Sequence, residues 1–380
     1  MTHPIRVLLV EDSLVVLTVL KRLLATAADI EVVGTACNGQ EALEQLPALQ
    51  PDVICVDYHM PVMDGLEFTQ RVMSQFPRPI LVISTSVHPK ENEHNVFRLL
   101  EAGAVDIFPK LKVGSDQDYE SFRQVLINKI KVLSGVKVFR RYTPKTTVAR
   151  QGSTPLTPST QQVSKPLEGI HTPIAFSRSP SAIKAIAIGA STGGPQALYT
   201  LLTQLPENLA LPVFCVQHIS EGFLQGLVNW LAAECRLPIK IAQAGAIPLP
   251  GVIYFAPERS HLEFGCQGQF LCTVAAPVDG HCPSVTVMLR SAARQYGSGL
   301  IGILLTGMGR DGASGMQDVA LAGGITIAQD EQSSVVFGMP KEAIALGGVQ
   351  HVLSIDAMPT ALAKMLSTSN KGNNRLKTPN

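Results

Sequence analysis

Three polar side chains in the second half of the sequence have the types needed for nucleophilic catalysis. Ser191 follows the apolar run Ala-Ile-Ala-Ile-Gly-Ala, and His218 and Asp311 each follow a further apolar run. A serine hydroxyl becomes an effective nucleophile when a histidine accepts its proton, and a carboxylate can fix the tautomer of that histidine. The expected chemistry is the hydrolysis of an ester or an amide through a serine intermediate.

Other assignments remain open for this group of residues. Ser191 precedes an expected helix and could be only its N-cap or part of a phosphate site. Asp330 also follows a strand and is the rival of Asp311, although the glycine-lined turn before Asp311 favours the latter. His261 and His281 remain as alternatives to His218.

The turns around these residues are rich in glycine. Gly189 to Gly193 match the pattern G-x-S-x-G, but the chain order Ser, His, Asp differs from the Ser, acid, His order of α/β-hydrolases. Met308 lies between two glycines, where a backbone N–H could face an oxyanion. Removal of one such donor typically raises the activation free energy of hydrolysis by about 3 kcal/mol.

A nucleotide-binding Rossmann-like module is an alternative function, because the turn at residues 189–194 superficially resembles a nucleotide turn. It does not match G-x-G-x-x-G, and the next strand ends in His218 where an acid for the ribose is expected. A catalytically inactive adaptor that docks on a receptor is another alternative.

A second set of polar residues lies at strand ends in the first part of the chain. Glu11, Asp12 and Asp57 would repel one another unless a cation joined them, and oxygen ligands of this kind suit Mg²⁺. Ser84 and Lys110 follow later strands and could hold a phosphoryl group attached to Asp57.

Both sets require parallel sheets, because the carboxyl ends of parallel strands meet at one edge. Apolar runs alternate with helical patterns, which predicts two doubly wound α/β domains. The strands carrying the site residues are expected at residues 5–10, 51–57, 80–83, 104–108, 185–190, 212–217 and 300–305. One helix is expected at residues 39–46, ending before Pro47. Gly189, Gly193 and Gly194 are expected to permit positive φ.

Composition divides the chain and bounds its class. We expect a first α/β domain at residues 1–125, a flexible linker rich in Pro, Ser and basic residues at 126–183, a second α/β domain that carries the candidate catalytic residues at 184–367, and a disordered tail at 368–380. The net charge of +1 argues against a nucleic-acid partner. Seven cysteines without a C-x-x-C pair predict free thiols, and we expect a cytoplasmic monomer that does not insert into a membrane.

Residues 1–125 resemble the response-regulator receiver family. The resemblance rests on residues 10–13, 57–65 and 102–104, on Ser84 and on Lys110. It implies that Asp57 is the phosphoacceptor, that Glu11 and Asp12 bind Mg²⁺ together with Asp57, and that Ser84 and Lys110 form a switch pair. Lys110 is followed by Leu111, where proline is usual.

Residues 184–367 resemble the catalytic domain of the chemotaxis protein-glutamate methylesterases, the CheB family. The resemblance rests on residues 188–195, 216–219, 254–257, 261–262, 280–285, 304–315 and 326–340. It implies the nucleophile Ser191, the base His218, the orienting acid Asp311, and Thr192 and Met308 near the oxyanion. Cys282 and Thr286 stand where arginine and aspartate would be expected.

The two resemblances together imply a phosphorylation-activated serine hydrolase. Its expected reactions are demethylation of glutamate γ-methyl esters on methyl-accepting chemoreceptors and deamidation of receptor glutamines, which serve chemotactic adaptation. A chemotaxis histidine kinase would be the phosphodonor, and no cofactor is expected in the catalytic domain. The unphosphorylated receiver is expected to cover the groove around Ser191, and phosphorylation of Asp57 to favour an open state.

Overall fold

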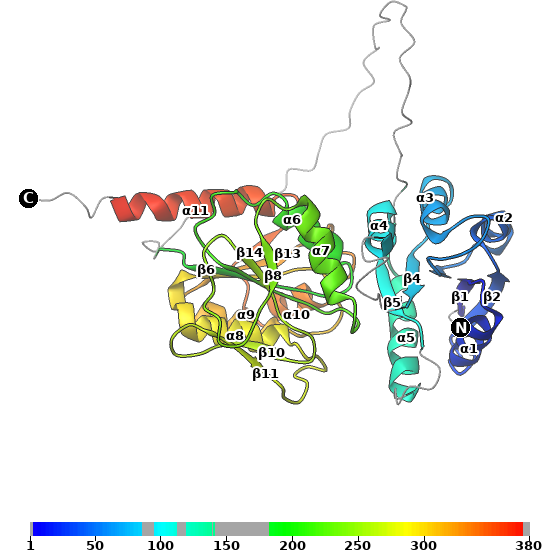
Figure 1. The fold of residues 1–380 in the computed structure, drawn as a ribbon, viewed down its shortest axis with the longest axis horizontal. Coiled ribbons are helices and arrows are strands. Elements are labelled where there is room, and N and C mark those ends of the chain that lie inside the picture. Colours follow the sequence, from blue (N-terminus) through cyan, green and yellow to red (C-terminus); the bar gives the residue numbers. More distant parts are fainter. Residues whose placement is uncertain (1–2, 86–94, 112–118, 139, 141–181, 375–380) are drawn as a thin grey trace, which may run out of the picture.

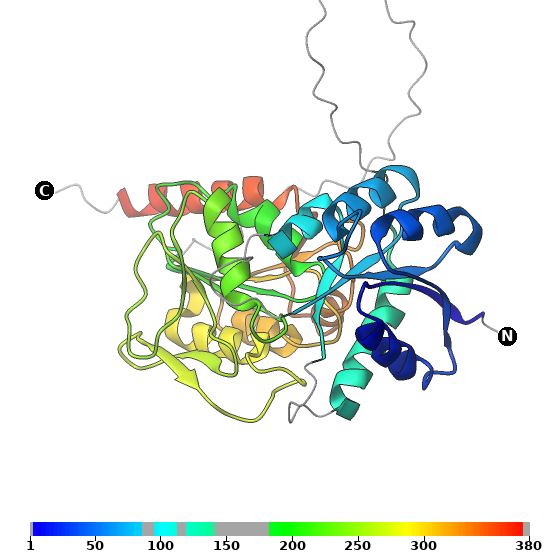
Figure 2. The same cartoon turned by 45° about the vertical axis from the view of Figure 1, so that its right-hand side comes forward.

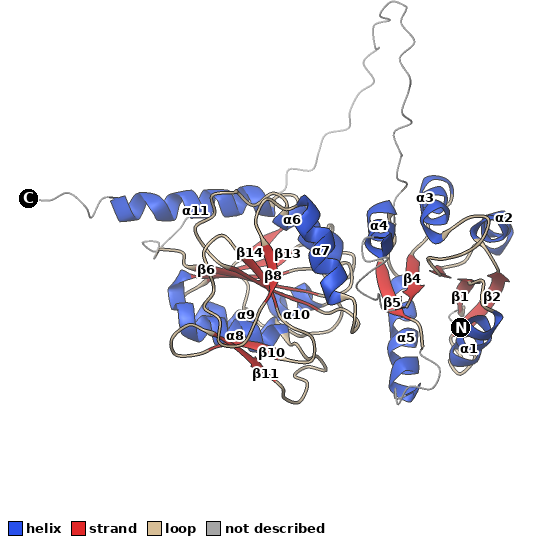
Figure 3. Ribbon diagram, viewed as in Figure 1, coloured by secondary structure: helices blue, strands red, loops and turns tan. Residues whose placement is uncertain are grey.

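The computed structural model describes residues 3–85, 95–111, 119–138, 140 and 182–374. Within these ranges the chain forms two α/β domains, each built on a parallel sheet (Figures 1 and 3). The fold class predicted from the sequence is confirmed. Most of the predicted linker, residues 141–181, lies outside the described residues.

The first domain has a five-stranded sheet with the order β2-β1-β3-β4-β5. Its strands are β1 (Ile5–Val10), β2 (Ile30–Ala36), β3 (Val53–Val56), β4 (Ile80–Ser84) and β5 (Asp106–Pro109). Its helices are α1 (Leu14–Leu24), α2 (Gly39–Leu49), α3 (Gly65–Gln75), α4 (Asn95–Ala102) and α5 (Tyr119–Ser134). The central strands are apolar and fully buried, because α1 and α5 cover one face of the sheet while α2, α3 and α4 cover the other.

One helix of this domain extends beyond its expected end, and another crosses the expected domain boundary at residue 125. The prediction that the second helix ends before Pro47 is wrong, because α2 continues to Leu49. The ring removes only one donor near the end of the helix, and Leu46 and Leu49 on either side of it pack against the core. Helix α5 crosses residue 125 and buries Leu126 and Ile130 against the same domain.

The second domain has a seven-stranded parallel sheet with the order β14-β13-β12-β6-β7-β9-β8 and a separate antiparallel hairpin, β10-β11. Its strands are β6 (Ala185–Ala190), β7 (Val213–Gln217), β8 (Ile239–Ile241), β9 (Ile253–Phe255), β10 (His261–Phe264), β11 (Phe270–Thr273), β12 (Leu300–Leu304), β13 (Ile325–Gln329) and β14 (His351–Leu353). Its helices are α6 (Gly194–Leu202), α7 (Leu224–Glu234), α8 (Val285–Tyr296), α9 (Ala313–Leu321), α10 (Met339–Ala345) and α11 (Met358–Asn374), with a short 3₁₀ turn at Gly297–Gly299.

Alternating residues of β6 divide the core of this domain into two layers. Ile186 and Ile188 face α6, α7 and α11, whereas Ala185 and Ala187 face α8, α9, α10 and the hairpin. The small alanines on the second face leave room for α8 to pack closely on the sheet. This close packing brings the N-terminus of α8 to the carboxyl end of β6.

Some elements were not anticipated from the sequence. The short strands β8 and β14 occupy the two edges of the sheet, where only three residues pair and no long apolar run is needed. Helix α11 continues to Asn374, so the expectation of disorder from residue 368 is wrong as far as Asn374. The buried turns at Met358 and Leu362 nucleate this helix, and each further residue then adds a hydrogen bond at little cost.

The two domains meet through α4 of the first and α6 and α7 of the second (Figures 1 and 2). The Trp230 ring is stacked between Phe97 of α4 and Tyr199 of α6, with ring centroids 5.6 Å and 5.2 Å away, and its Nε1–H donates to Glu101 at 2.5 Å. Gln196 Nε2 donates to the Ala104 carbonyl at 2.7 Å. The interface therefore combines apolar stacking with hydrogen bonds.

All seven cysteines are free, as expected. Burial raises the pKa of the Cys55 thiol to about 12, which makes it inert as a nucleophile. Among the described residues, no helix is both long and apolar enough to cross a bilayer.

Candidate active site

The three candidate catalytic residues follow neighbouring strands of the seven-stranded sheet. Ser191 follows β6, which lies between β7 and β12; His218 follows β7, and the loop containing Asp311 follows β12. The chain adds β7 on one side of β6 and β12 on the other, so the order of the strands changes direction at β6. Open parallel sheets form their binding sites at such a switch point. The structure therefore brings the three predicted residues to one edge.

The turn that carries Ser191 depends on glycine for two different reasons. Gly193, the N-cap residue directly before α6, has a φ of 75° and so lies in the left-handed region that favours glycine. The expectation of positive φ is wrong for Gly189 and Gly194, which are required for space. A Cβ on Gly189 would lie 2.1 Å from Val285 Cγ1, and one on Gly194 would lie 2.0 Å from Gln217 Oε1.

Hydrogen bonds fix the backbone of this turn to both neighbouring strand ends. Gln217 Nε2 donates to the carbonyls of Ser191 and His218, each at 2.8 Å. The Ser191 N–H donates to the Thr306 carbonyl at 3.0 Å. Gln217 is 4% exposed, and its amide joins the nucleophile turn to the histidine strand. The position of Ser191 is thus set before any substrate binds.

Asp311 is fully buried, and four donors surround its carboxylate. Oδ1 accepts from the Ser284 hydroxyl at 2.8 Å and from the Thr286 N–H at 2.9 Å. Oδ2 accepts from the Val285 N–H and from His218 Nε2, both at 2.8 Å. The backbone donors belong to the first turn of α8, where the helix dipole also favours negative charge.

These contacts keep Asp311 ionised. Burial alone would raise the pKa of its carboxyl group, but the hydrogen bond and charge of His218, with the donors of α8, lower that pKa to about 2. An ionised carboxylate can only accept, so the proton of the imidazole must lie on Nε2 of His218. Nδ1 is then the basic nitrogen, the reverse of the usual Ser-His-Asp arrangement.

In the described structure no hydrogen bond joins Ser191, the candidate nucleophile, to His218, the candidate base. His218 Nδ1 is buried without a hydrogen-bond partner, and the Ser191 hydroxyl forms none with any described residue. The lone pair of His218 Nδ1 and the hydroxyl of Ser191 lie at adjoining strand ends. A bound substrate would align these two groups. In free enzymes such bonds often tighten only when substrate binds.

Two backbone N–H groups are available near Ser191. A Cβ on Gly307 would lie 2.7 Å from Ser191 Cβ, so the turn containing Met308 touches the nucleophile directly. Neither Thr192 nor Met308 uses its N–H in a hydrogen bond with any described residue. The Thr306 hydroxyl donates to the Thr192 carbonyl at 3.0 Å and thereby ties the two turns together.

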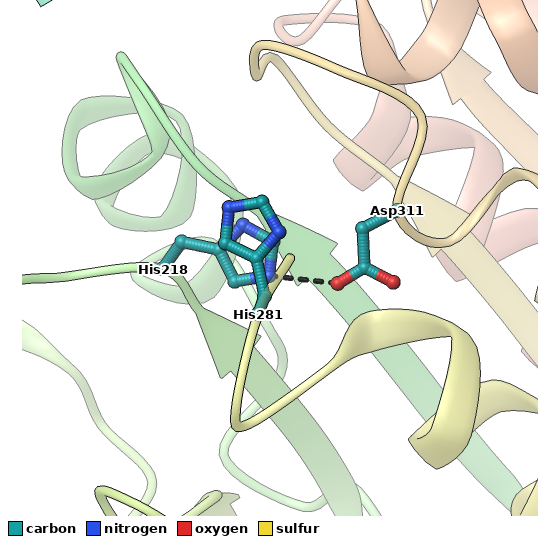
Figure 4. Close-up of side chains that lie close together, drawn as sticks. All are labelled: His218, His281 and Asp311. Atoms are coloured by element: carbon teal, nitrogen blue, oxygen red, sulfur yellow. Dashed lines mark hydrogen bonds and ion pairs between the residues drawn. The ribbon is translucent and has the colours of Figure 1, made fainter. Parts of the chain in front are cut away.

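A second histidine lies flat against the candidate base. The rings of His218 and His281 are parallel within 2°, with centroids 3.7 Å apart (Figure 4). His281 is placed by a tight hairpin turn in which Val278 and His281 exchange both backbone hydrogen bonds. The two residues between them, Asp279 and Gly280, have φ of 50° and 83°, the positive values that an Asp-Gly turn of this kind requires.

The environment of His281 favours the neutral form of its imidazole. Burial lowers the pKa of its imidazole, and the adjacent His218 lowers it further. Its Nδ1 donates to the Asp279 carbonyl at 2.9 Å. A neutral ring stacked on His218 holds the plane of the base without competing for its proton.

The ligand atoms of His218, His281 and Asp311 lie within 4.8 Å of one another, a spacing that a metal ion could span. The ring geometry does not fit one. Imidazole lone pairs lie in the plane of the ring, and two parallel planes cannot share a metal position.

The alternatives left open by the sequence have structural roles. Asp330 accepts from the Ser333 N–H and hydroxyl within its own turn. His261 accepts the Ser284 N–H on Nδ1 at 3.1 Å and donates from Nε2 to the Ala276 carbonyl at 3.1 Å. It therefore supports Ser284, which in turn holds Asp311.

Sequence reasoning did not assign roles to Ser284, Gln217 or Asp279. Ser284 carries a recognisable signal, because a serine directly before a helix is a preferred N-cap, and its hydroxyl accepts from Val287 N–H. The pair Asp279-Gly280 is likewise a hairpin-turn signal. Gln217 carried no local signal, because its partners are set by neighbouring strands.

The predicted acidic cluster of the first domain is also assembled. One oxygen each from Glu11, Asp12 and Asp57 lies within 4.8 Å of the others. Lys110 Nζ pairs with Asp57 Oδ2 at 2.8 Å and with Glu11 Oε2 at 2.9 Å. Ser84 is buried at the end of β4, directly beside β5.

The carboxylates of this cluster also repel one another. Burial raises the pKa of Glu11 and of Asp57, and their mutual repulsion adds to the rise for Glu11. Asp12 is exposed and forms no ion pair with any residue that the structure describes. The donor set therefore fits a hard divalent ion coordinated by oxygen.

Each half of the chain matches the model of a known protein family. Residues 186–362 match the family model of the CheB methylesterases, and residues 7–114 match that of the response regulator receiver domain. Neither matched family model describes a nucleotide-binding domain.

Curated relatives match over nearly the full length. The protein-glutamate methylesterase/protein-glutamine glutaminase 1 of Syntrophus aciditrophicus is 37% identical over 95% of this chain and 98% of its own. The corresponding protein of Nitrosospira multiformis is 38% identical over 96% of this chain and 97% of its own. The solved catalytic domain of Thermotoga maritima CheB is 36% identical and covers 48% of this chain and 98% of its own, with a TM-score of 0.47.

Proposed function

Because this chain belongs to the CheB family of protein-glutamate methylesterases and protein-glutamine glutaminases, we propose that it demethylates glutamate γ-methyl esters and deamidates glutamines on chemoreceptors under control of its receiver domain. The observation that carries this function in the site is the buried Asp311–His218 pair, which leaves His218 Nδ1 without a hydrogen-bond partner at the strand end adjoining that of Ser191. The proposed domains are the receiver at 1–125, extended by the remainder of α5, the linker up to 183, and the catalytic domain at 184–367.

The proposed reaction uses only side chains and backbone groups of the second domain. His218 Nδ1 accepts the proton of the Ser191 hydroxyl as its oxygen attacks the ester carbonyl. The N–H groups of Thr192 and Met308 donate to the oxyanion that develops there. His218 then protonates the leaving methoxide oxygen, so that the C–O bond breaks and methanol departs; with a glutamine it protonates the leaving nitrogen, and ammonia departs. Water hydrolyses the acyl-serine by the same steps in reverse and releases a glutamate carboxylate.

Asp311 and His281 act on His218 during these steps. The imidazole becomes positively charged when it takes the serine proton, and the ionised Asp311 stabilises that charge through Nε2. The stacked His281 restricts rotation of the His218 ring. The positioning of the base therefore depends on the α8 N-terminus and on the hairpin turn at residues 278–281.

The receiver would be phosphorylated on Asp57 by a chemotaxis histidine kinase. Glu11, Asp12 and Asp57 are the residues that would hold Mg²⁺, which neutralises phosphoryl oxygens when bound. Lys110 already pairs with Asp57, and Ser84 lies on the adjoining strand end. These two residues would rearrange around the phosphoryl group.

The interface provides a route from Asp57 to the catalytic domain. Val335 of the catalytic domain packs against the apolar residues of the receiver and also lies against Gly193, where a Cβ would be 2.5 Å away. The receiver thus contacts the rim of the nucleophile turn. We propose that phosphorylation loosens these contacts and opens the site to a receptor helix. We further propose that the protein acts as a cytoplasmic monomer.

Methanol release from methylated receptor fragments tests this function. The wild-type protein should release methanol, and acetyl phosphate with Mg²⁺ should raise the rate by about tenfold, which corresponds to ~1.4 kcal/mol in the domain equilibrium. Asp57→Asn should keep the basal rate and lose the activation. Equal activation of the Asp57→Asn protein would contradict control by this aspartate, and no release by folded wild type would contradict the esterase function.

Trp230 is the only tryptophan in the chain and should report domain separation. Its ring is now enclosed by Phe97 and Tyr199, so phosphorylation should expose it and shift its fluorescence emission to longer wavelength. The measurement is an emission spectrum with and without acetyl phosphate, with Asp57→Asn as the control. Activation without any change in the Trp230 spectrum would mean that this interface stays closed.

A further inference from the structure

Arg310 is an exposed cation directly beside a buried residue of the candidate site. It directly precedes the buried Asp311, yet its side chain is 76% exposed. Its Nε donates to Asp279 Oδ1 at 2.9 Å, and within the described part of the chain its two terminal nitrogens form no hydrogen bond. The guanidinium is therefore anchored on one side and open on the other.

The anchor of Arg310 belongs to the framework of the active site. Asp279 lies in the hairpin turn that stacks His281 on His218, and its carbonyl accepts from His281 Nδ1. Its second carboxylate oxygen lies 3.4 Å from the Thr286 hydroxyl, which accepts the Gly312 N–H. Arg310 is thus held at a fixed position relative to the base, unlike an ordinary surface arginine.

An arginine with Nε occupied still presents two parallel N–H groups, the geometry that binds a carboxylate in a bidentate manner. The ester or amide group that reacts is uncharged, so it would not need this cation. Glu342 on α10 is the other carboxylate whose charge acts on Arg310, and like Asp279 it belongs to the protein. Among the described residues only Asp279 forms an ion pair with Arg310, so the open side is accessible to an incoming carboxylate.

We propose that Arg310 recognises a free carboxylate on the protein substrate, that of an Asp or Glu adjacent on the helix surface to the residue being hydrolysed. This assignment rests on the proposed function and adds a preference to it: esters or glutamines flanked by acidic residues are better substrates. Arg310 is a binding residue for the segment around the scissile group, and Asp279 is its positioning residue.

Matched receptor fragments test this preference. Each carries one glutamate γ-methyl ester, with Glu, Gln or Lys placed one helical turn away, and methanol release by the full-length protein is followed with acetyl phosphate present. The wild type should prefer the Glu fragment over the Gln fragment by up to about fivefold in kcat/KM, the size expected for an exposed ion pair, mainly through KM. Added salt should reduce the preference.

Charge substitutions at Arg310 separate recognition from structure. R310Q should bring the Glu-to-Gln ratio of kcat/KM to about one, R310K should retain part of it, and R310E should reverse it in favour of the Lys fragment. The matched control is R259Q, because Arg259 is similarly exposed and paired with Glu221 but lies on another loop. The control should keep the wild-type ratio.

The outcomes distinguish this inference from the function on which it rests. If folded wild type releases no methanol from any fragment, the proposed function fails. If it hydrolyses all three fragments equally well, only the role of Arg310 fails. If R310Q lowers kcat by the same factor on every fragment and keeps the ratio, Arg310 serves only to hold Asp279, which also overturns the assignment.

Discussion

Replacement of Ser191 by alanine is expected to lower kcat for methanol release by about 10⁴-fold or more. The backbone of the turn would be unaffected, because Ser191 is held through its N–H and carbonyl by Thr306 and Gln217. The hydroxyl itself makes no hydrogen bond with any described residue, so its loss should not destabilise the fold. The expected phenotype is a folded and phosphorylatable protein without hydrolytic activity.

The measurement combines methanol release with labelling by a fluorophosphonate ester, which reacts with an activated serine. Wild type should be labelled at Ser191, and Ser191→Ala should not be labelled at all. Ser220→Ala is a suitable control, because this serine lies two residues after His218 and should not alter either readout. Substantial release by the Ser191→Ala protein would rule out the serine mechanism, and unlabelled wild type without activity would favour the docking-adaptor alternative.

Asp311→Asn is expected to reduce kcat by about 10⁴-fold, as the same change does in other serine hydrolases. Each carboxylate oxygen accepts two hydrogen bonds, and an NH₂ group can accept none. If the amide faces His218, it donates to Nε2 and forces the proton onto Nδ1, the nitrogen that must be free. If it faces Ser284, it meets two donors and leaves both without an acceptor.

This substitution should therefore also lower the free energy of unfolding, by about 1–3 kcal/mol for each buried donor that it leaves unpaired. Methanol release gives the first effect, and urea unfolding gives the second. Asp318→Asn provides the control, since Asp318 pairs with Arg290 at a partly exposed site and supports no catalytic group. Near-normal activity of Asp311→Asn would show that the tautomer of His218 is fixed by some other group.

Most of the fold was predictable because it depends on local patterns. The buried strands β6, β7 and β12 are short apolar runs flanked by turn residues, and such runs are typical of strands that a parallel sheet buries on both faces. The edge strands β8 and β14 were missed because an edge position requires little hydrophobicity. The end of α2 was misjudged because a proline near a helix terminus removes only one hydrogen bond.

The sequence by itself determined which residue types stand at the strand ends, and hence the candidate serine, histidine and aspartate and the acidic cluster around Asp57. These follow from chain order alone, since parallel strands end at a common edge. It also contained the signals for the Ser284 cap and the Asp279-Gly280 turn.

Only the tertiary structure decided how these residues interact. Asp311 accepts from Nε2 of His218 rather than from Nδ1, His281 stacks on His218, and Arg310 pairs with Asp279. Each of these contacts joins segments that are distant in the sequence. The physical reason is that hydrogen-bond donors and ring planes are positioned by packing between elements, here α8 against β6 and a hairpin turn against β7, and no local pattern encodes that packing.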